Sequence, residues 1–223
     1  MNHLLSPVSP PALPLAREQY DRPYQDQLNN VLRLYFEKLN FNLNNVTNAT
    51  GGRHLQFPYA AVQRTTDKLF TANTATLITF DQNDYLNACT NDGTDGIVVE
   101  YTGLYNYQFS VQFANTAAQE YTAWIWLRKN TTDVPNTGSK FDVPKKHGAS
   151  DGYLIAACNF YIDLTAGDSV SLYAAVSQAY VPATTDGIYM EAYPAQTVPP
   201  AAFAHPAIPS VVATLTFVST YEV

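Results

Sequence analysis

Four aspartates in a short Asn-rich stretch come nearest to the spacing of a chemical site: Asp81, Asp84, Asp92 and Asp95. Carboxylate and amide oxygens are the ligands that Ca²⁺ takes in proteins. The spacing does not match the twelve-residue, helix-flanked calcium loop, whereas Asp and Asn side chains form turns by hydrogen-bonding nearby backbone. We therefore interpret the stretch as turn-forming and predict no metal site; a bound calcium is the alternative.

No other pattern predicts catalysis. The four histidines, His3, His54, His147 and His205, are scattered, and none has the H-x-H or H-E-x-x-H spacing of a zinc site. The chain has no G-x-S-x-G nucleophile elbow and no Gly-rich loop that opens a helix, so neither a hydrolase triad nor a phosphate cradle is indicated. We predict that the protein is not an enzyme and has no catalytic residue and no cofactor.

The two cysteines, Cys89 and Cys158, lie in or near apolar segments typical of strands. Two cysteines do not make a disulfide framework. Buried free thiols are the favoured interpretation, and one disulfide between them is the alternative.

The low charge of the chain excludes several classes of protein. Of its 223 residues 14% are charged and 46% hydrophobic, and the formal net charge is −7. A typical soluble domain carries about 25% charged residues, so neutral polar side chains must form much of the surface. A nucleic-acid binder needs a basic excess and a membrane helix about 20 apolar residues in a row, and the sequence has neither. Prolines interrupt the first residues, so we expect no signal peptide.

The elements that must position any site begin with an arm and a helix in residues 1–53. Residues 1 to about 22 form a proline-rich arm, which is extended because proline fixes φ and lacks a donor. Residues 22–43 predict an amphipathic helix, with Asp21 as its cap and Pro23 in its first turn. Its apolar stripe has two open interpretations, packing on the chain's own β domain or docking on another protein, including a second copy.

Residues 54–223 predict an all-β domain. In residues 104–113, tyrosine, phenylalanine and valine alternate with polar residues, which is typical of a strand with one buried face. Further strands are expected at 76–80, 96–101, 120–128, 154–164, 169–176, 187–193 and 211–221. Asp-Gly and Asn-containing turns separate them. Short strands at regular spacing predict a β-sandwich or jelly roll. Residues 120–128 carry aromatic residues on both faces, so we expect some of that surface to be buried between subunits.

Three segments resemble, in order and spacing, the jelly-roll domains of the tumour-necrosis-factor-like and complement globular-head families. They are the strand 102–111 (TGLYNYQFSV), the strand and Asn turn 124–130 (WIWLRKN) and the hairpin 164–172 (LTAGDSVSL). The resemblance covers residues 57 to 221. It implies an all-β, TNF-like jelly-roll sandwich that assembles as a homotrimer. The family's Gly-Tyr pair is shifted by one residue here, and a Pro-rich segment at 194–209 precedes the last strand.

A second resemblance concerns the whole chain. A low-charge jelly roll behind a short arm and helix looks like tailed-phage virion proteins, and residues 27–36 (QLNNVLRLYF) are similar to the N-terminal anchors of small virion proteins. This resemblance implies a place on the capsid surface of a virion, with the major capsid protein or another virion protein as partner and with neither nucleic acid nor membrane.

Our leading hypothesis is therefore a structural virion protein, a trimeric decoration or cement protein that stabilises the phage shell through its N-terminal arm. The alternative is a receptor-binding module of a head or tail fibre that recognises a cell-surface glycan through Tyr-rich loops such as 178–193. A cytokine-like ligand is disfavoured by the missing signal. The residues predicted to contact the capsid or the trimer partner are apolar side chains of the arm and helix: Leu4, Leu5, Val8, Leu13, Leu15, Tyr20, Leu28, Val31, Leu32 and Tyr35.

Overall fold

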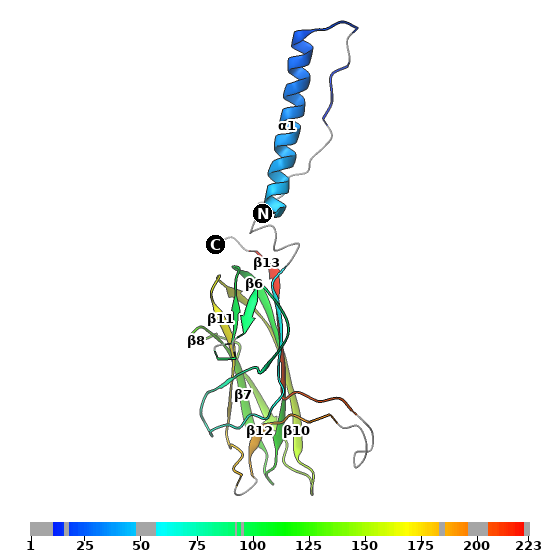
Figure 1. Cartoon of the computed structure of the whole chain (residues 1–223). Coiled ribbons are helices and arrows are strands. Elements are labelled where there is room, and N and C mark those ends of the chain that lie inside the picture. The colour runs from blue at the N-terminus through cyan, green and yellow to red at the C-terminus, as the bar shows by residue number, and fades with distance from the viewer. Residues whose placement is uncertain are drawn as a thin grey trace. The chain divides into compact units, whose positions relative to one another are not determined.

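The chain divides into two compact units, Met1–Phe57 and Pro58–Val223 (Figure 1). The predicted boundary, between residues 53 and 54, lies four residues before this division. The computed structural model describes residues 11–15, 18–47, 57–91, 93–94, 96–182, 186–195 and 205–220. Each unit is described by itself.

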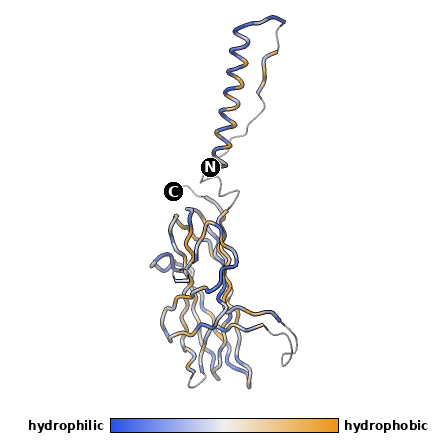
Figure 2. The backbone as a smooth tube through the Cα atoms, viewed as in Figure 1, coloured by the Kyte–Doolittle hydropathy of each residue, from blue (hydrophilic) through white to orange (hydrophobic). Residues whose placement is uncertain are grey.

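The first unit is built around helix α1, Arg22–Thr47. The amide of Gln25 donates to the Asp21 carbonyl at 3.0 Å, so Asp21 stands directly before the helix, as the sequence predicts. The helix runs four residues past its predicted end at residue 43 because no glycine or proline interrupts the chain before Gly51. Its apolar and polar residues alternate along the chain at helical spacing, as the orange and blue segments of Figure 2 show.

The second unit is all β. Its strands are β1 (Tyr59–Arg64), β2 (Thr76–Ile78), β3 (Gln82–Asn87), β4 (Cys89–Asn91), β5 (Ile97–Val99), β6 (Gly103–Asn115), β7 (Tyr121–Lys129), β8 (Thr132–Asp133), β9 (Ser139–Val143), β10 (Gly152–Leu164), β11 (Ser169–Val176), β12 (Ile188–Met190) and β13 (Val211–Ser219).

Within the described residues the strands form two antiparallel sheets. Sheet A has the order β10-β6-β13-β1-β3, with β12 continuing the line of β13 beside the end of β6. Sheet B has the order β4-β5-β11-β7-β8, with β2 also paired to β11 and β9 also paired to β7. The long strands β6, β7, β10, β11 and β13 fall in sheets A, B, A, B and A. This crossing from sheet to sheet is a jelly roll, and it confirms the predicted fold class.

The core lies between the two sheets. The five residues predicted on the inner face of β6 are buried, and so are alternate residues of β7 and β13. Burial of such side chains contributes about 25 cal/mol per Å² of apolar area, so this layer dominates the stability of the unit. The inner residues of these three strands are Tyr105, Tyr107, Phe109, Val111, Phe113, Ala123, Ile125, Leu127, Val211, Ala213, Leu215 and Phe217.

The prediction of a turn at residues 81–84 is wrong for residues 82–84, which belong to strand β3 at the edge of sheet A. Its pairing with β1 supplies the backbone partners, and nearby side chains donate hydrogen bonds to Asp84 of the strand and to Asp81 just before it. Gln63 and Gln82 donate to Asp84, and Thr65 and Thr66 donate to Asp81. Asp92 and Asp95 lie outside the described residues.

Candidate functional site

Four strands of sheet A carry almost no charge on their outer face, although two carboxylates border it: Asp84 of β3 accepts from Gln63, and Glu191 accepts from Tyr193, which packs on Tyr153. Burial alternates along its strands, so every second residue of β1, β6, β10 and β13 points away from the core. Among these outward positions, all of which the structure describes, Asp163 alone carries a charge. We call this surface the uncharged face. Its members are Tyr59, Ala61, Gln63, Leu104, Asn106, Gln108, Ser110, Gln112, Tyr153, Ile155, Ala157, Asn159, Tyr161, Asp163, Val212, Thr214, Thr216 and Val218, while the outward Ala114 is buried.

Large apolar side chains of the uncharged face stand in solvent. Ile155 is 65% exposed and Tyr161 is 64% exposed, both on β10. The register places Tyr161 beside Asn106 of β6, which in turn lies beside Thr216 of β13. Aromatic and aliphatic groups are thus interleaved with neutral amides and hydroxyls across the sheet, which is the composition of an interface that pairs without like-charge repulsion.

A shallow hollow of about 220 Å³ lies in the middle of the uncharged face. Its lining comes from β6 and β13, where Gln108 pairs with Thr214 and Ser110 with Val212. Since these side chains are short or neutral, the hollow can receive a projecting apolar side chain of a partner.

The outer face of sheet B has the opposite character, because ion pairs and aromatic contacts cover it. Arg128 Nε lies 2.8 Å from Asp133 Oδ1, and its guanidinium carbon stands 3.9 Å from the centre of the Tyr173 ring. Trp126 donates to the same Asp133 oxygen at 2.7 Å and stacks on Tyr173. Trp126 is therefore covered within the chain, whereas Trp124 on the same side stays 36% exposed, and the more exposed apolar side chains lie on sheet A.

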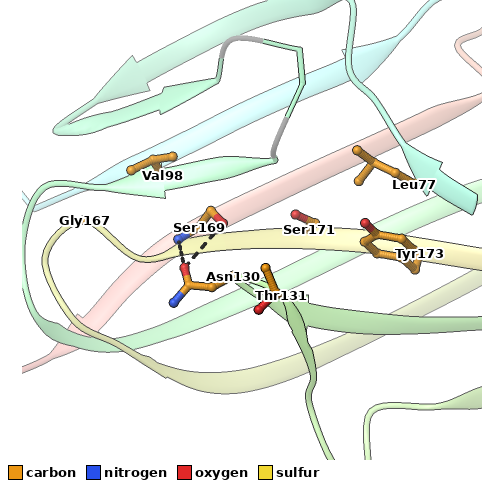
Figure 3. A pocket seen from close by; sticks show the side chains of 8 residues that line it. All are labelled: Leu77, Val98, Asn130, Thr131, Gly167, Ser169, Ser171 and Tyr173. Carbon is orange, nitrogen blue, oxygen red and sulfur yellow. Dashed lines mark hydrogen bonds between the residues drawn. The ribbon is translucent and has the colours of Figure 1, made fainter.

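A pocket of about 360 Å³ opens on this outer face of sheet B (Figure 3). Strands β5 and β2 share one edge of β11, with β5 pairing at Ser169–Val170 and β2 at Leu172–Ala174. The pocket lies where that edge passes from one strand to the other. Its walls combine apolar groups, neutral polar groups and one aromatic ring: Leu77, Val98, Asn130, Thr131, Gly167, Ser169, Ser171 and Tyr173.

Asp168 fixes one end of this pocket. Its carboxylate accepts hydrogen bonds from Asn130 Nδ2 at 2.9 Å and from the Thr165 amide at 2.7 Å, and it lies 2.7 Å from Lys129 Nζ. Burial alone would raise the pKa of Asp168, but these donors outweigh burial and hold the pKa below its ordinary value. Asn130 adopts a left-handed φ of 53° and accepts from the Ser169 amide, which ties the β7–β8 turn to the start of β11.

The tyrosines of the loop region 178–193 contact Glu191 and one another. Tyr189 donates to Glu191 Oε1 at 2.8 Å, and Tyr193 donates to Glu191 Oε2 at 2.6 Å. Tyr180 packs on the Tyr189 ring at 5.1 Å between centroids. Burial, followed by the hydrogen bond to Glu191, raises the pKa of Tyr189 and Tyr193. Glycan recognition by these rings would need this cluster to open, so the pocket on sheet B is the better-formed polar site.

The predicted contact residues of the arm and helix fall into two groups. Leu13, Leu15 and Tyr20 are exposed, and Leu15 reaches 91%. The helix residues Leu28, Val31, Leu32 and Tyr35 are half-buried within their unit. Leu4, Leu5 and Val8 lie outside the described residues.

The members of the uncharged face were not among the predicted contact residues. The signal was present in residues 153–162 (YLIAACNFYI), where both alternating sets of positions are mainly apolar. A strand with one solvent-exposed face has apolar residues alternating with polar ones. This segment is apolar at both sets of positions, which indicates that its outer face is also covered by a partner.

Both cysteines are free. Cys89 is buried, and burial followed by the nearby Glu100 charge raises its thiol pKa to about 12. Cys158 is half-buried, and its Sγ lies 3.6 Å from Ser139 Oγ.

The described part of the chain lacks two further features. No cluster of three or more His, Cys, Asp or Glu side chains there could hold a metal ion. No helix there is both long and apolar enough to span a membrane.

The sequence matches no protein-family model and no curated protein. Among solved structures, the chain is similar to murine APRIL, crystallised at pH 5.0, with 12% identity and a TM-score of 0.43 over 72% of this chain and 98% of that chain. It is also similar to the globular domain of a zebrafish complement 1qA protein, with 10% identity and a TM-score of 0.40 over 74% of this chain and 98% of that chain.

Proposed function

We propose that this chain is a structural virion protein, a homotrimeric decoration or cement protein on the capsid surface of a tailed phage. The observation that carries the proposal is that large hydrophobic side chains are left exposed on two surfaces: the uncharged face of sheet A, where Ile155 and Tyr161 are 65% and 64% exposed, and the arm with its helix. Monomeric soluble proteins rarely expose apolar patches larger than a few hundred Å², and larger ones mark interaction sites. In this proposal the protein's own copies cover the uncharged face and the shell protein covers the arm.

The chemistry of the uncharged face favours copies of the same chain as its partner. Equivalent residues of three copies approach one another near a three-fold axis, and like charges brought together there cost several kcal/mol. With Asp163 as the single charge among the outward positions of β1, β6, β10 and β13, all described here, that cost is small away from the β3 edge, where Asp84 lies. A closed ring of copies also avoids open-ended growth.

The arm supplies the attachment to the shell. Leu13, Leu15 and Tyr20 expose 52%, 91% and 84% of their area, so they gain most from being covered by a partner. A segment that spans a junction between shell subunits must be peeled off before the subunits separate. Its binding free energy therefore opposes expansion of the shell by internal pressure.

Removal of the arm tests the proposal. The full chain and a chain lacking residues 1–22 are added to undecorated particles, and bound protein is measured after sedimentation of the particles. The variant Leu13→Ser/Leu15→Ser keeps the whole helix and serves as a milder matched change. We expect the deletion to abolish binding and the double variant to weaken it at least about tenfold, as expected for the exposure of two large apolar groups. Undiminished binding of the deleted chain would overturn the proposal.

The pocket of Figure 3 favours a second candidate function, recognition of a cell-surface glycan by a fibre module. Its volume of about 360 Å³ lies at the lower end of the range of ligand sites. Hydroxyl and amide groups beside the Tyr173 ring suit a neutral sugar, which offers hydroxyls for hydrogen bonds and C–H groups for an aromatic face.

A variant whose pocket is blocked tests the glycan-binding candidate independently of the decoration protein. Thr131 is exposed and lines the pocket, whereas the next residue, Thr132, is exposed and does not. On a glycan array the full chain should bind a neutral glycan, Thr131→Arg should lose that binding, and Thr132→Arg should keep it. Absence of any bound glycan removes the second candidate and leaves the decoration protein.

A further inference from the structure

We propose that helix α1 forms a parallel three-stranded coiled coil with the same helix of two other copies of this chain. The inference rests on the proposed trimer and assigns the helix to self-association, which leaves the arm for the shell. In a closed ring the copies are related by rotation about one axis, so equivalent helices that lie along this axis run parallel.

The spacing of the helix core positions carries the inference. Counting from Leu28, the stripe recurs at alternating intervals of four and three residues, which is the a/d pattern of a heptad repeat. Residues at such positions pack against their own equivalents, so the pattern complements itself. The series is Leu28, Leu32, Tyr35, Leu39, Asn42 and Val46. Asn42, at a d position, is the one polar residue of the series.

The width of the stripe favours three helices over two. A seam that carries apolar groups at a and d alone suits a narrow contact, whereas an added neighbouring position widens the apolar band. Here Phe36 and Leu43, each directly following a d position, are also apolar and are 58% and 57% exposed. A helix in a three-membered ring touches two neighbours and can cover this wider band.

The opposite side of the helix is polar at its b and f positions, while the c positions hold Leu34 and Phe41, 53% and 60% exposed. The b and f positions hold Asp26, Asn30, Arg33, Glu37, Asn40 and Asn44, all exposed. Arg33 pairs with Glu37 four residues on, at 3.9 Å. Such a solvent-facing side is what a helix keeps when its other side is covered.

The apolar area that the helix leaves exposed indicates how much of the trimer interface the helix can form. An aromatic side chain buries about 150–250 Å², so the partly exposed apolar residues of the stripe leave roughly 500 Å² to cover. A stable interface buries about 800 Å² per partner. The coiled coil therefore adds to the contact made by the uncharged face and does not replace it.

Cross-linking of matched cysteine variants tests the inference. In a Cys158→Ser background, Asn42→Cys places a thiol at a core position and Asn44→Cys places one on the polar side. Each full-length chain is treated with a short bismaleimide, and linked pairs are counted by denaturing electrophoresis while sedimentation reports the native mass. We expect Asn42→Cys to link at least about tenfold faster than Asn44→Cys. Equal rates in a chain that sediments as a trimer would overturn the coiled coil alone, and a monomeric mass would overturn the trimer as well.

A second pair of variants distinguishes loss of the coiled-coil contact from a general loss of helix stability. Leu39→Ser and Leu34→Ser make the same substitution in the same helix, and both leucines are exposed, at 41% and 53%. Leu39 is in the stripe and Leu34 is outside it. Leu39→Ser should raise the trimer dissociation constant at least about tenfold, while Leu34→Ser should leave it within about twofold. Equal effects of the two variants would contradict the inference.

Discussion

Asp168 joins two turns that lie far apart in the sequence. The turn containing it precedes β11, and its carboxylate holds Lys129 and Asn130 at the end of β7. The sequence indicated this hairpin through its Ala-Gly-Asp turn, yet it did not indicate the partner, because the contact depends on the pairing of β7 with β11. A local motif therefore predicted the turn, and only the sheet register supplied its role.

The lowered pKa of Asp168 predicts an acid-sensitive contribution to stability. Because the folded pKa lies below the ordinary value of about 3.9, the contribution is fully present above that value and is lost as the pH falls through the folded pKa. Asp168→Asn should lower the free energy of unfolding by about 1–3 kcal/mol at pH 7, and by less near pH 3. Urea unfolding at both pH values measures this, and an equal loss at the two would contradict it.

Cys89 and Cys158 should differ in reactivity. Burial raises the pKa of Cys89 to about 12, so almost none of it is thiolate at pH 8, and the folded chain shields it. Mass spectrometry after brief treatment with iodoacetamide should find Cys158 labelled well before Cys89. The prediction fails if Cys89 is labelled first in the folded protein. Denatured chain, in which both should react, is the control.

At the scale of elements, strands with a single buried face were predictable and edge strands were not. Strand β11 was predicted with its observed bounds, and β6 and β7 within two residues, because their apolar residues alternate. Strand β3 (QNDYLN) was missed because Asn and Asp are depleted in strands and favour turns. Its pairing with β1 overrides that local preference.

Strand β10 should carry much of the self-association, since both its faces are apolar and it forms an edge of sheet A. Ile155→Lys puts a charge on the uncharged face without touching the core, because Ile155 is 65% exposed. We expect the trimer dissociation constant to rise at least about tenfold, since a buried unpaired charge costs several kcal/mol. Light scattering after size-exclusion chromatography measures it.

The matched control is Leu69→Lys, at a similarly exposed leucine outside both sheets. It should leave the mass unchanged. An equal loss of assembly in both variants, or in neither, would show that the uncharged face has no special part.

At the scale of the whole molecule, the 14% of charged residues is unevenly distributed. Ion pairs gather on the outer face of sheet B, while the outward positions of β1, β6, β10 and β13 hold Asp163 alone among the described residues. Composition predicted a surface poor in charge. It did not predict which face, because that depends on strand register, where a shift of one residue exchanges the two faces.

The mass of the full chain in solution tests the central claim most directly. The chain weighs 24.6 kDa, and sedimentation equilibrium at micromolar concentration should give three times that mass. A single species of one chain mass across the concentration range would contradict the trimer on which the proposed function depends.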